Sequence, residues 1–189
     1  MPGMVDDDFE RSVVFIFDHG KNGSAGLIIN RPSPSTIKQM FDRMGLQLGR
    51  TDLHHQHVYS GGPVYTDRGF VLHESQQTYE IACGGLQTES KASFYASTLA
   101  VLGGLEMTTS QDVLDAFSVG AGPQKIFMTL GYAAWQAGQL EAELMQNDWL
   151  TAPAQHDIIF DVPTEQRYKA ALALLGIDEM RLSSIAGTA

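Results

Sequence analysis

The sequence has a single cysteine and no long hydrophobic run, and both absences narrow the class of protein. Cys83 has no second cysteine with which to form an internal disulfide, which is typical of a chain in a reducing compartment. No apolar stretch approaches the ~20 residues that a membrane-spanning helix needs. The opening segment, MPGMVDDDFE, is acidic and lacks the basic-then-apolar layout of a signal peptide. We therefore predict a cytoplasmic protein without membrane association.

Basic residues are also scarce. The 12 Lys and Arg face 22 Asp and Glu, which gives a formal net charge of −10. Proteins that bind nucleic acids usually gain affinity by neutralising phosphates with clustered Lys and Arg. The sequence therefore predicts no direct nucleic-acid contact.

Hydrophobic residues, in contrast, are plentiful enough for one core. They make up 43% of the 189 residues, and no repeat, low-complexity tract or linker divides the chain. We therefore expect residues 1–189 to form a single domain.

Short β-branched and aromatic runs predict an α+β fold with a mixed, largely antiparallel sheet, because most runs are separated by hairpin-length connections. Asn22-Gly23 is a strong turn signal between the first two runs. The segment 94–102 is apolar and fits either a helix or a strand. The predicted strands cover residues 12–17, 25–30, 68–73, 78–82, 125–130 and 157–160.

Helices are predicted where apolar residues recur at helical spacing behind a capping residue. Ser35 is expected to cap a helix that runs to Met44. Thr109, followed by Asp112, resembles a capping box and would open a second helix that ends near Gly120. A last helix is expected to begin at Pro163-Thr164.

Residues 130–150, LGYAAWQAGQLEAELMQNDWL, lead from a predicted strand into an amphipathic helix. A helix that began at Ala133 would place Trp135 opposite the apolar stripe. A helix that began near Ala137 would leave residues 132–136 as a strand-to-helix turn that carries Trp135. We favour the second arrangement because Gly131 and Gly138 bracket the turn. Trp135 then either covers the seam between strand and helix or forms the wall of a binding site.

Several motifs occur in an order that resembles the AlgH/YqgE-type family of uncharacterised bacterial proteins. They span almost the whole chain. They are MPGM with DF and RSVV at the start, GLIINRP at 26–32, GGPV at 61–64, RGFVLH at 68–73, TTSQDVL at 108–114 and LGYAAW with GQLEAEL and NDWL at 130–150.

The resemblance implies an α+β fold whose sheet curls into a pseudo-barrel flanked by helices. Some members carry a transcriptional-regulator label, and the family supplies no catalytic residues to carry over. This sequence departs from the family pattern where it lacks a short upstream strand, has Tyr168 for a common Trp, and ends in Gly187-Thr188-Ala189 instead of Gly-His-Ala. Ser24-Ala25-Gly26 replaces a pattern with a central Met.

A binding or interaction module is the function that the residues favour. Polar residues at strand ends would converge with the Trp135 turn on one groove, which would recognise a small anionic ligand or a protein partner. Gly61-Gly62 would present backbone amides to an anion, or would simply form a tight turn. The arginines would line the groove, or would instead hold carboxylates in buried pairs. The predicted ligand-binding residues are Asn30, Arg31, Gly61, Gly62, Arg68, His73, Trp135 and Gln139.

Two alternatives remain beside the module. A hydrolase would use His73 with a nearby Ser or Thr, such as Ser60 or Ser110, although no G-x-S-x-G motif is present. A transcriptional regulator would act without touching DNA. No metal or other cofactor is expected, because His54 and His57 have HxxH spacing without companion ligands.

Overall fold

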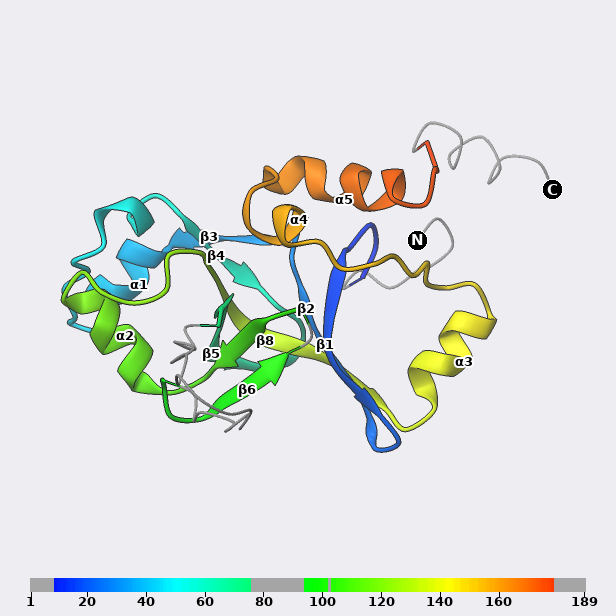
Figure 1. Cartoon of the computed structure of the whole chain (residues 1–189), viewed down its shortest axis with the longest axis horizontal. Coiled ribbons are helices and arrows are strands. Elements are labelled where there is room, and N and C mark those ends of the chain that lie inside the picture. Colours follow the sequence, from blue (N-terminus) through cyan, green and yellow to red (C-terminus); the bar gives the residue numbers. More distant parts are fainter. Residues whose placement is uncertain (1–8, 76–93, 102, 179–189) are drawn as a thin grey trace, which may run out of the picture.

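The chain folds around one sheet that nearly closes into a barrel (Figure 1). The computed structural model describes residues 9–75, 94–101 and 103–178. The strands follow the order β1-β2-β8-β5-β7-β6. Off this path, β4 pairs with β8, and β3 pairs with β4. All neighbours are antiparallel except β4 and β8. The expected α+β fold with a curled, largely antiparallel sheet is therefore confirmed.

The element bounds are as follows. The strands are β1 Val14–Gly20, β2 Gly23–Ile28, β3 Pro32–Thr36, β4 His57–Ser60, β5 Val64–Glu74, β6 Thr98–Val101, β7 Leu105–Thr108 and β8 Ile126–Gln136. The helices are α1 Ile37–Arg43, a 3-10 turn Thr51–Leu53, α2 Gln111–Ser118, α3 Gln139–Met145, α4 His156–Phe160 and α5 Thr164–Ala173. No helix in these described ranges is long and apolar enough to cross a membrane.

The first hairpin is present and longer than predicted. β1 and β2 stay paired out to Gly20 and Gly23, so only Lys21 and Asn22 form the turn. The expected strand at 68–73 lies within β5, and its predicted partner at 78–82 lies outside the described residues. The apolar segment at 94–102 contains strand β6.

The predicted turn around Trp135 is wrong, because β8 continues as a strand through Gln136. The second half of β8 pairs with β2, and Ser24 lies opposite Trp135. The chain turns two residues later, at Gly138, whose φ of 77° suits glycine. Pairing with a strand more than a hundred residues away therefore overrides the local glycine signals.

Three other local predictions also need correction. Residues 157–160 lie in helix α4 rather than in a strand, with Ile158 and Ile159 buried. Such a short apolar run suits either state, and periodicity alone does not decide. Thr36, not Ser35, caps α1, in a full capping box with Gln39.

The capping box predicted from Thr109 does not form. Ser110 occupies the N-cap of α2, and its hydroxyl lies within hydrogen-bonding distance of both the Asp112 carboxylate and the Ala96 carbonyl. Burial raises the pKa of Asp112, but hydrogen bonds from Ser110 and from the amides of Ala96 and Val113 outweigh it, and the net pKa lies below its usual value.

The sheet separates two large apolar clusters, because side chains alternate along each strand. Leu72 and Phe127 belong to the cluster that includes residues of α4 and α5. Val71 and Met128 face the opposite way, toward α1 and α2. A third, smaller cluster joins Ala133 and Trp135 of β8 with Leu140 of α3.

Candidate functional site

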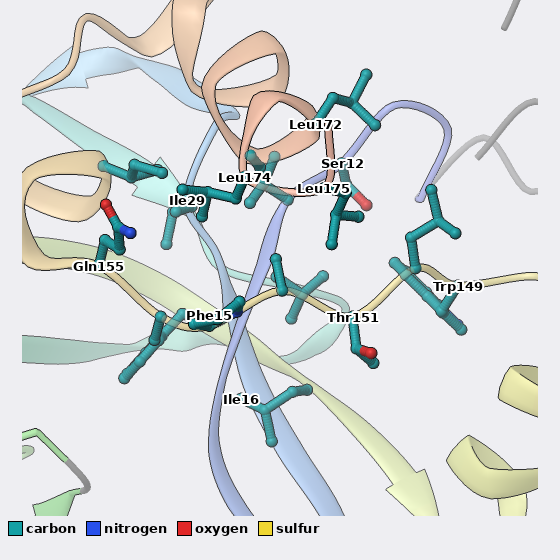
Figure 2. A pocket seen from close by; sticks show the side chains of 18 of the residues that line it. Ser12, Phe15, Ile16, Ile29, Trp149, Thr151, Gln155, Leu172, Leu174 and Leu175 are labelled. Carbon is teal, nitrogen blue, oxygen red and sulfur yellow. The ribbon is translucent and has the colours of Figure 1, made fainter. Parts of the chain in front are cut away.

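A cavity of ≈260 Å³ lies beside strand β1, between α5 and residues 150–155, which we call the strap. The strap leads from the α3 side of the molecule into α4 and crosses in front of Phe15 (Figure 2). None of the residues lining the cavity carries a charge. They are Ser12, Val13, Val14, Phe15, Ile16, Ile29, Trp135, Leu140, Leu144, Trp149, Leu150, Thr151, Ala152, Pro153, Ala154, Gln155, Ile158, Ile159, Ala171, Leu172, Leu174 and Leu175.

One wall of the cavity contains both tryptophans of the chain, and Glu143 holds both. The indole N–H groups of Trp135 and Trp149 donate to the same carboxylate oxygen, Oε2, at 2.9 and 2.7 Å. The two rings meet edge to face, with centroids 5.8 Å apart. Phe9 lies against both rings. Trp135 is only 6% exposed. This wall is therefore fixed in place without a ligand.

The opposite wall comes from α4 and α5, and Arg167 anchors it. Arg167 is 5% exposed, and its guanidinium donates to the backbone carbonyls of Val162 (3.0 Å) and Ile29. It lies 5.1 Å from the ring centroids of Tyr59 and Phe127. Burial lowers the pKa of this guanidinium. Arg167 was not among the residues predicted from the sequence, although it lies one helical turn before Ala171 and so on the inward side of α5.

Asn30 and Arg31 fix the segment that precedes β1. The Asn30 side chain accepts from the Val13 amide at 2.8 Å and donates to the Arg11 carbonyl at 2.9 Å. Arg31 donates to the carbonyl of Glu10 at 3.0 Å. These hydrogen bonds all join side chain to backbone, and neither residue lines the cavity.

Gly61 and Gly62 form a tight crossing over β8. The Gly61 amide donates to Leu130 at 2.8 Å, so it is already engaged within the sheet. A Cβ on either glycine would overlap the β8 backbone near Gly131 or Ala133, and the φ of Gly62 is 148°. The geometry therefore supports the interpretation of Gly61 and Gly62 as a tight structural turn.

Arg68 and His73 lie elsewhere on β5. Arg68 is exposed and stacks over the Tyr65 ring, 4.7 Å from its centroid. His73 is fully buried, with Nδ1 2.9 Å from the Glu74 carbonyl and Nε2 2.9 Å from Thr108 Oγ1. Its hydroxyl partner is therefore Thr108, and neither Ser60 nor Ser110 is among its hydrogen-bond partners.

Gln139 is connected to the cavity wall through Glu143. Its side-chain amide donates to Glu143 Oε1 at 2.9 Å, and its Oε1 accepts from the Gln136 amide at 3.0 Å. Among the predicted site residues, only Trp135 lines the cavity, and Gln139 supports Trp135 indirectly. Asn30, Arg31 and Arg68 lie outside this cavity. Arg31 donates to a backbone carbonyl, and Arg68 stacks on a ring.

The histidine loop makes backbone contacts. His54 Nε2 lies 3.2 Å from the Leu48 carbonyl, and His57 Nδ1 lies 3.1 Å from that of Ser33. Across the described ranges, no group of three or more His, Cys, Asp or Glu is placed to hold a metal ion.

Comparisons with known proteins agree with the motifs. Residues 1–180 match the model of the AlgH-like family, DUF179. A UPF0301 protein from Paracidovorax citrulli is 51% identical over 196 residues, covering all of this chain and 92% of that protein. One from Polaromonas sp. is 51% identical, covering all of this chain and 91% of that one.

Solved structures show the same relationship. The solution structure of the AlgH protein from Pseudomonas aeruginosa is 44% identical, with a TM-score of 0.73, and the match covers all of this chain and 92% of that one. A crystal structure of a Corynebacterium diphtheriae protein is 20% identical, with a TM-score of 0.67 over all of this chain and 87% of that one, which is a likeness of fold. The chain therefore belongs to the AlgH-like family.

Proposed function

We propose that this protein is a non-enzymatic binding module and that the cavity beside the strap receives an uncharged apolar group. The observation that carries the proposal is the combination of a lining without charge and a tryptophan wall that is already fixed by Glu143. Apolar pockets with a few directed polar groups are the usual form of a binding site. Ser12, Thr151 and Gln155 are the polar side chains here.

A small anion is the weaker of the two occupants that the sequence suggested. Burying a charge without a partner is costly, and no lining residue offers a positive one. Arg31 donates to a backbone carbonyl, Arg68 stacks on an aromatic ring, and neither arginine lines the cavity. An apolar group of a protein partner or of a small molecule fits this lining better.

Catalysis by His73 has little support. The ring is fully buried, and both of its nitrogens lie within hydrogen-bonding distance of protein oxygens. We place the module in the cytoplasm. Any role in transcription would run through a partner, because the net charge of −10 opposes contact with DNA.

The test uses 1-octanol as an apolar probe and inorganic phosphate as an anionic one. Titration of ¹⁵N-labelled protein with octanol should shift the indole N–H signals of Trp135 and Trp149 in a saturable way, and phosphate should neither shift them nor compete. An absent octanol response, or competition by phosphate, would contradict the proposal.

A matched pair of variants on α5 locates the probe. Ala171 lines the cavity, whereas Ala173 is exposed and does not. Ala171→Leu should fill part of the space and abolish the octanol response, and Ala173→Leu should leave it unchanged. Equal responses from the two variants would place octanol elsewhere.

A further inference from the structure

The cavity runs along an open edge of the sheet. β1 is the terminal strand in the sheet order, and β2 is its only strand partner within the described residues. The consecutive residues 12–16 all line the cavity. Side chains of a strand alternate between faces, so a cavity lined by consecutive residues abuts the backbone edge rather than one face.

The hydrogen-bond pattern shows which backbone groups point toward that edge. Val13 faces β2, because its carbonyl accepts from Ile29 at 2.9 Å and its amide donates to Asn30. The next pair is Val14 with Ile28, and the Ile28 amide donates away from β1, to Gly61. Backbone direction alternates along an antiparallel strand. The N–H and C=O groups of Val14 and the N–H of Ile16 therefore point away from β2, on the side of the cavity, before the register with β2 shifts between Ile16 and Asp18.

Apolar walls flank this edge on both faces of the sheet. Trp135, Leu140 and Trp149 stand on the side to which Val14 packs. Ile158, Ile159 and Leu174 belong to the cluster that contains Phe15, on the other side. Figure 2 shows Leu174 and Leu175 above β1 and Trp149 to one side of it.

We propose that the occupant is an extended, uncharged, apolar segment of a partner protein, which pairs with β1 as an added strand between β1 and the strap. The inference rests on the proposed binding function and names its ligand. A partner strand supplies donors and acceptors at the two-residue repeat of Val14 and Ile16, and its side chains alternate between the two apolar walls. An alkyl chain matches the walls but not the backbone groups.

Charge defines the partner further. The uncharged lining requires that the paired residues carry no charge. The chain as a whole carries a net charge of −10, which favours a partner segment whose flanking residues are basic rather than acidic. The partner motif is thus a short apolar stretch with Lys or Arg beside it.

The probe is the peptide acetyl-Val-Ala-Val-Ala-Val-Gly-Lys-Lys-amide, measured by amide hydrogen exchange of the ¹⁵N-labelled chain. At saturation, exchange at the Val14 and Ile16 amides should slow by about tenfold or more, because each open amide gains a backbone partner. Phe15, already paired inside the sheet, serves as the internal reference and should not change. Octanol should leave all three rates unchanged.

A second peptide lacks the hydrogen-bond donors of the apolar stretch. Methylation of the five amide nitrogens in the apolar stretch keeps the charge and the side chains, and we expect binding to weaken by about tenfold or more. The Ala171→Leu variant should also lose the parent peptide, whereas Ala173→Leu should retain it.

The possible outcomes distinguish the added-strand proposal from the proposed binding function on which it rests. If octanol binds but the peptide does not, or if the peptide binds without slowing Val14 and Ile16, the added strand is wrong and the apolar module stands. Equal affinity for the methylated peptide overturns the added strand as well. If neither octanol nor the peptide binds, both proposals fall together.

Discussion

Replacing Glu143 with alanine tests whether its carboxylate organises the cavity wall. Oε2 accepts from Trp135 and Trp149, and Oε1 accepts from Gln139. The Trp135 ring is 6% exposed, so its N–H has little access to replacement water. Trp149 is half-buried, and its N–H can turn to solvent more easily.

The expected loss follows from those two environments. A buried donor left without an acceptor costs about 1–3 kcal/mol, and a half-buried one costs less. We therefore expect Glu143→Ala to lower the free energy of unfolding by about 2–3 kcal/mol, and Tm by about 4–10 °C for a chain of this size. Urea unfolding followed by circular dichroism measures the change without depending on tryptophan emission.

Glu141 supplies the matched control, because it lies on the same helix and its removal changes the charge equally. Its carboxylate is 46% exposed and reaches His19 only at 3.7 Å. Glu141→Ala should therefore change the free energy of unfolding by at most about 0.5 kcal/mol. Glu143→Gln keeps an acceptor oxygen and should fall between the two. If Glu143→Ala costs no more than Glu141→Ala, Glu143 does not support the wall.

Three further outcomes are expected in the same urea assay. Gly62→Val should lower the free energy of unfolding by about 3 kcal/mol or more, because the φ of 148° at Gly62 and the adjacent β8 backbone exclude a side chain. Ser60 is exposed, so Ser60→Ala should lower it by less than about 0.5 kcal/mol. Similar losses from the two variants would contradict this prediction. Thr108→Val should cost about 1–3 kcal/mol, since buried His73 loses its hydroxyl partner, and an unchanged midpoint would count against that hydrogen bond. The folded pKa of Asp112 is lowered, so its stabilisation is present above the unfolded pKa of about 3.9 and disappears as pH falls through the folded value. Asp112→Asn should therefore lose less stability than the parent between about pH 5 and pH 2, and identical acid profiles would refute the assignment.

The parts of the fold that could be predicted are those fixed by neighbours in sequence. The β1–β2 hairpin follows from two apolar runs around Asn22-Gly23, and both strands are present with the turn in that place. The course of β8 could not be obtained in the same way. Gly131 and Gly138 suggested a turn at Trp135, but pairing with β2 extends the strand past it. Tertiary pairing of this kind leaves no local mark in the sequence.

The cavity could not be predicted from the sequence, for a related physical reason. Its lining comes from segments that are far apart in sequence, including β1, the strap and α5, and each contributes ordinary apolar residues. The sequence instead indicated the polar residues at strand ends as candidates, because they contrast with the apolar runs beside them. In the structure Asn30 and Arg31 bind backbone groups, because the chain leading into β1 needs partners for its own amides and carbonyls.

Arginine at a strand end is therefore ambiguous evidence for an anion site in a chain of this composition. A guanidinium has five N–H donors, so it serves equally well to satisfy carbonyls where the chain leaves regular structure. Arg167 shows the extreme case: it is 5% exposed, and its guanidinium donates to two backbone carbonyls. By engaging the Ile29 carbonyl it ties α5 to the chain just beyond β2, and so sets the distance between α5 and β1. The charge thus acts on the cavity through the position of an apolar wall, while the cavity itself is lined by uncharged side chains.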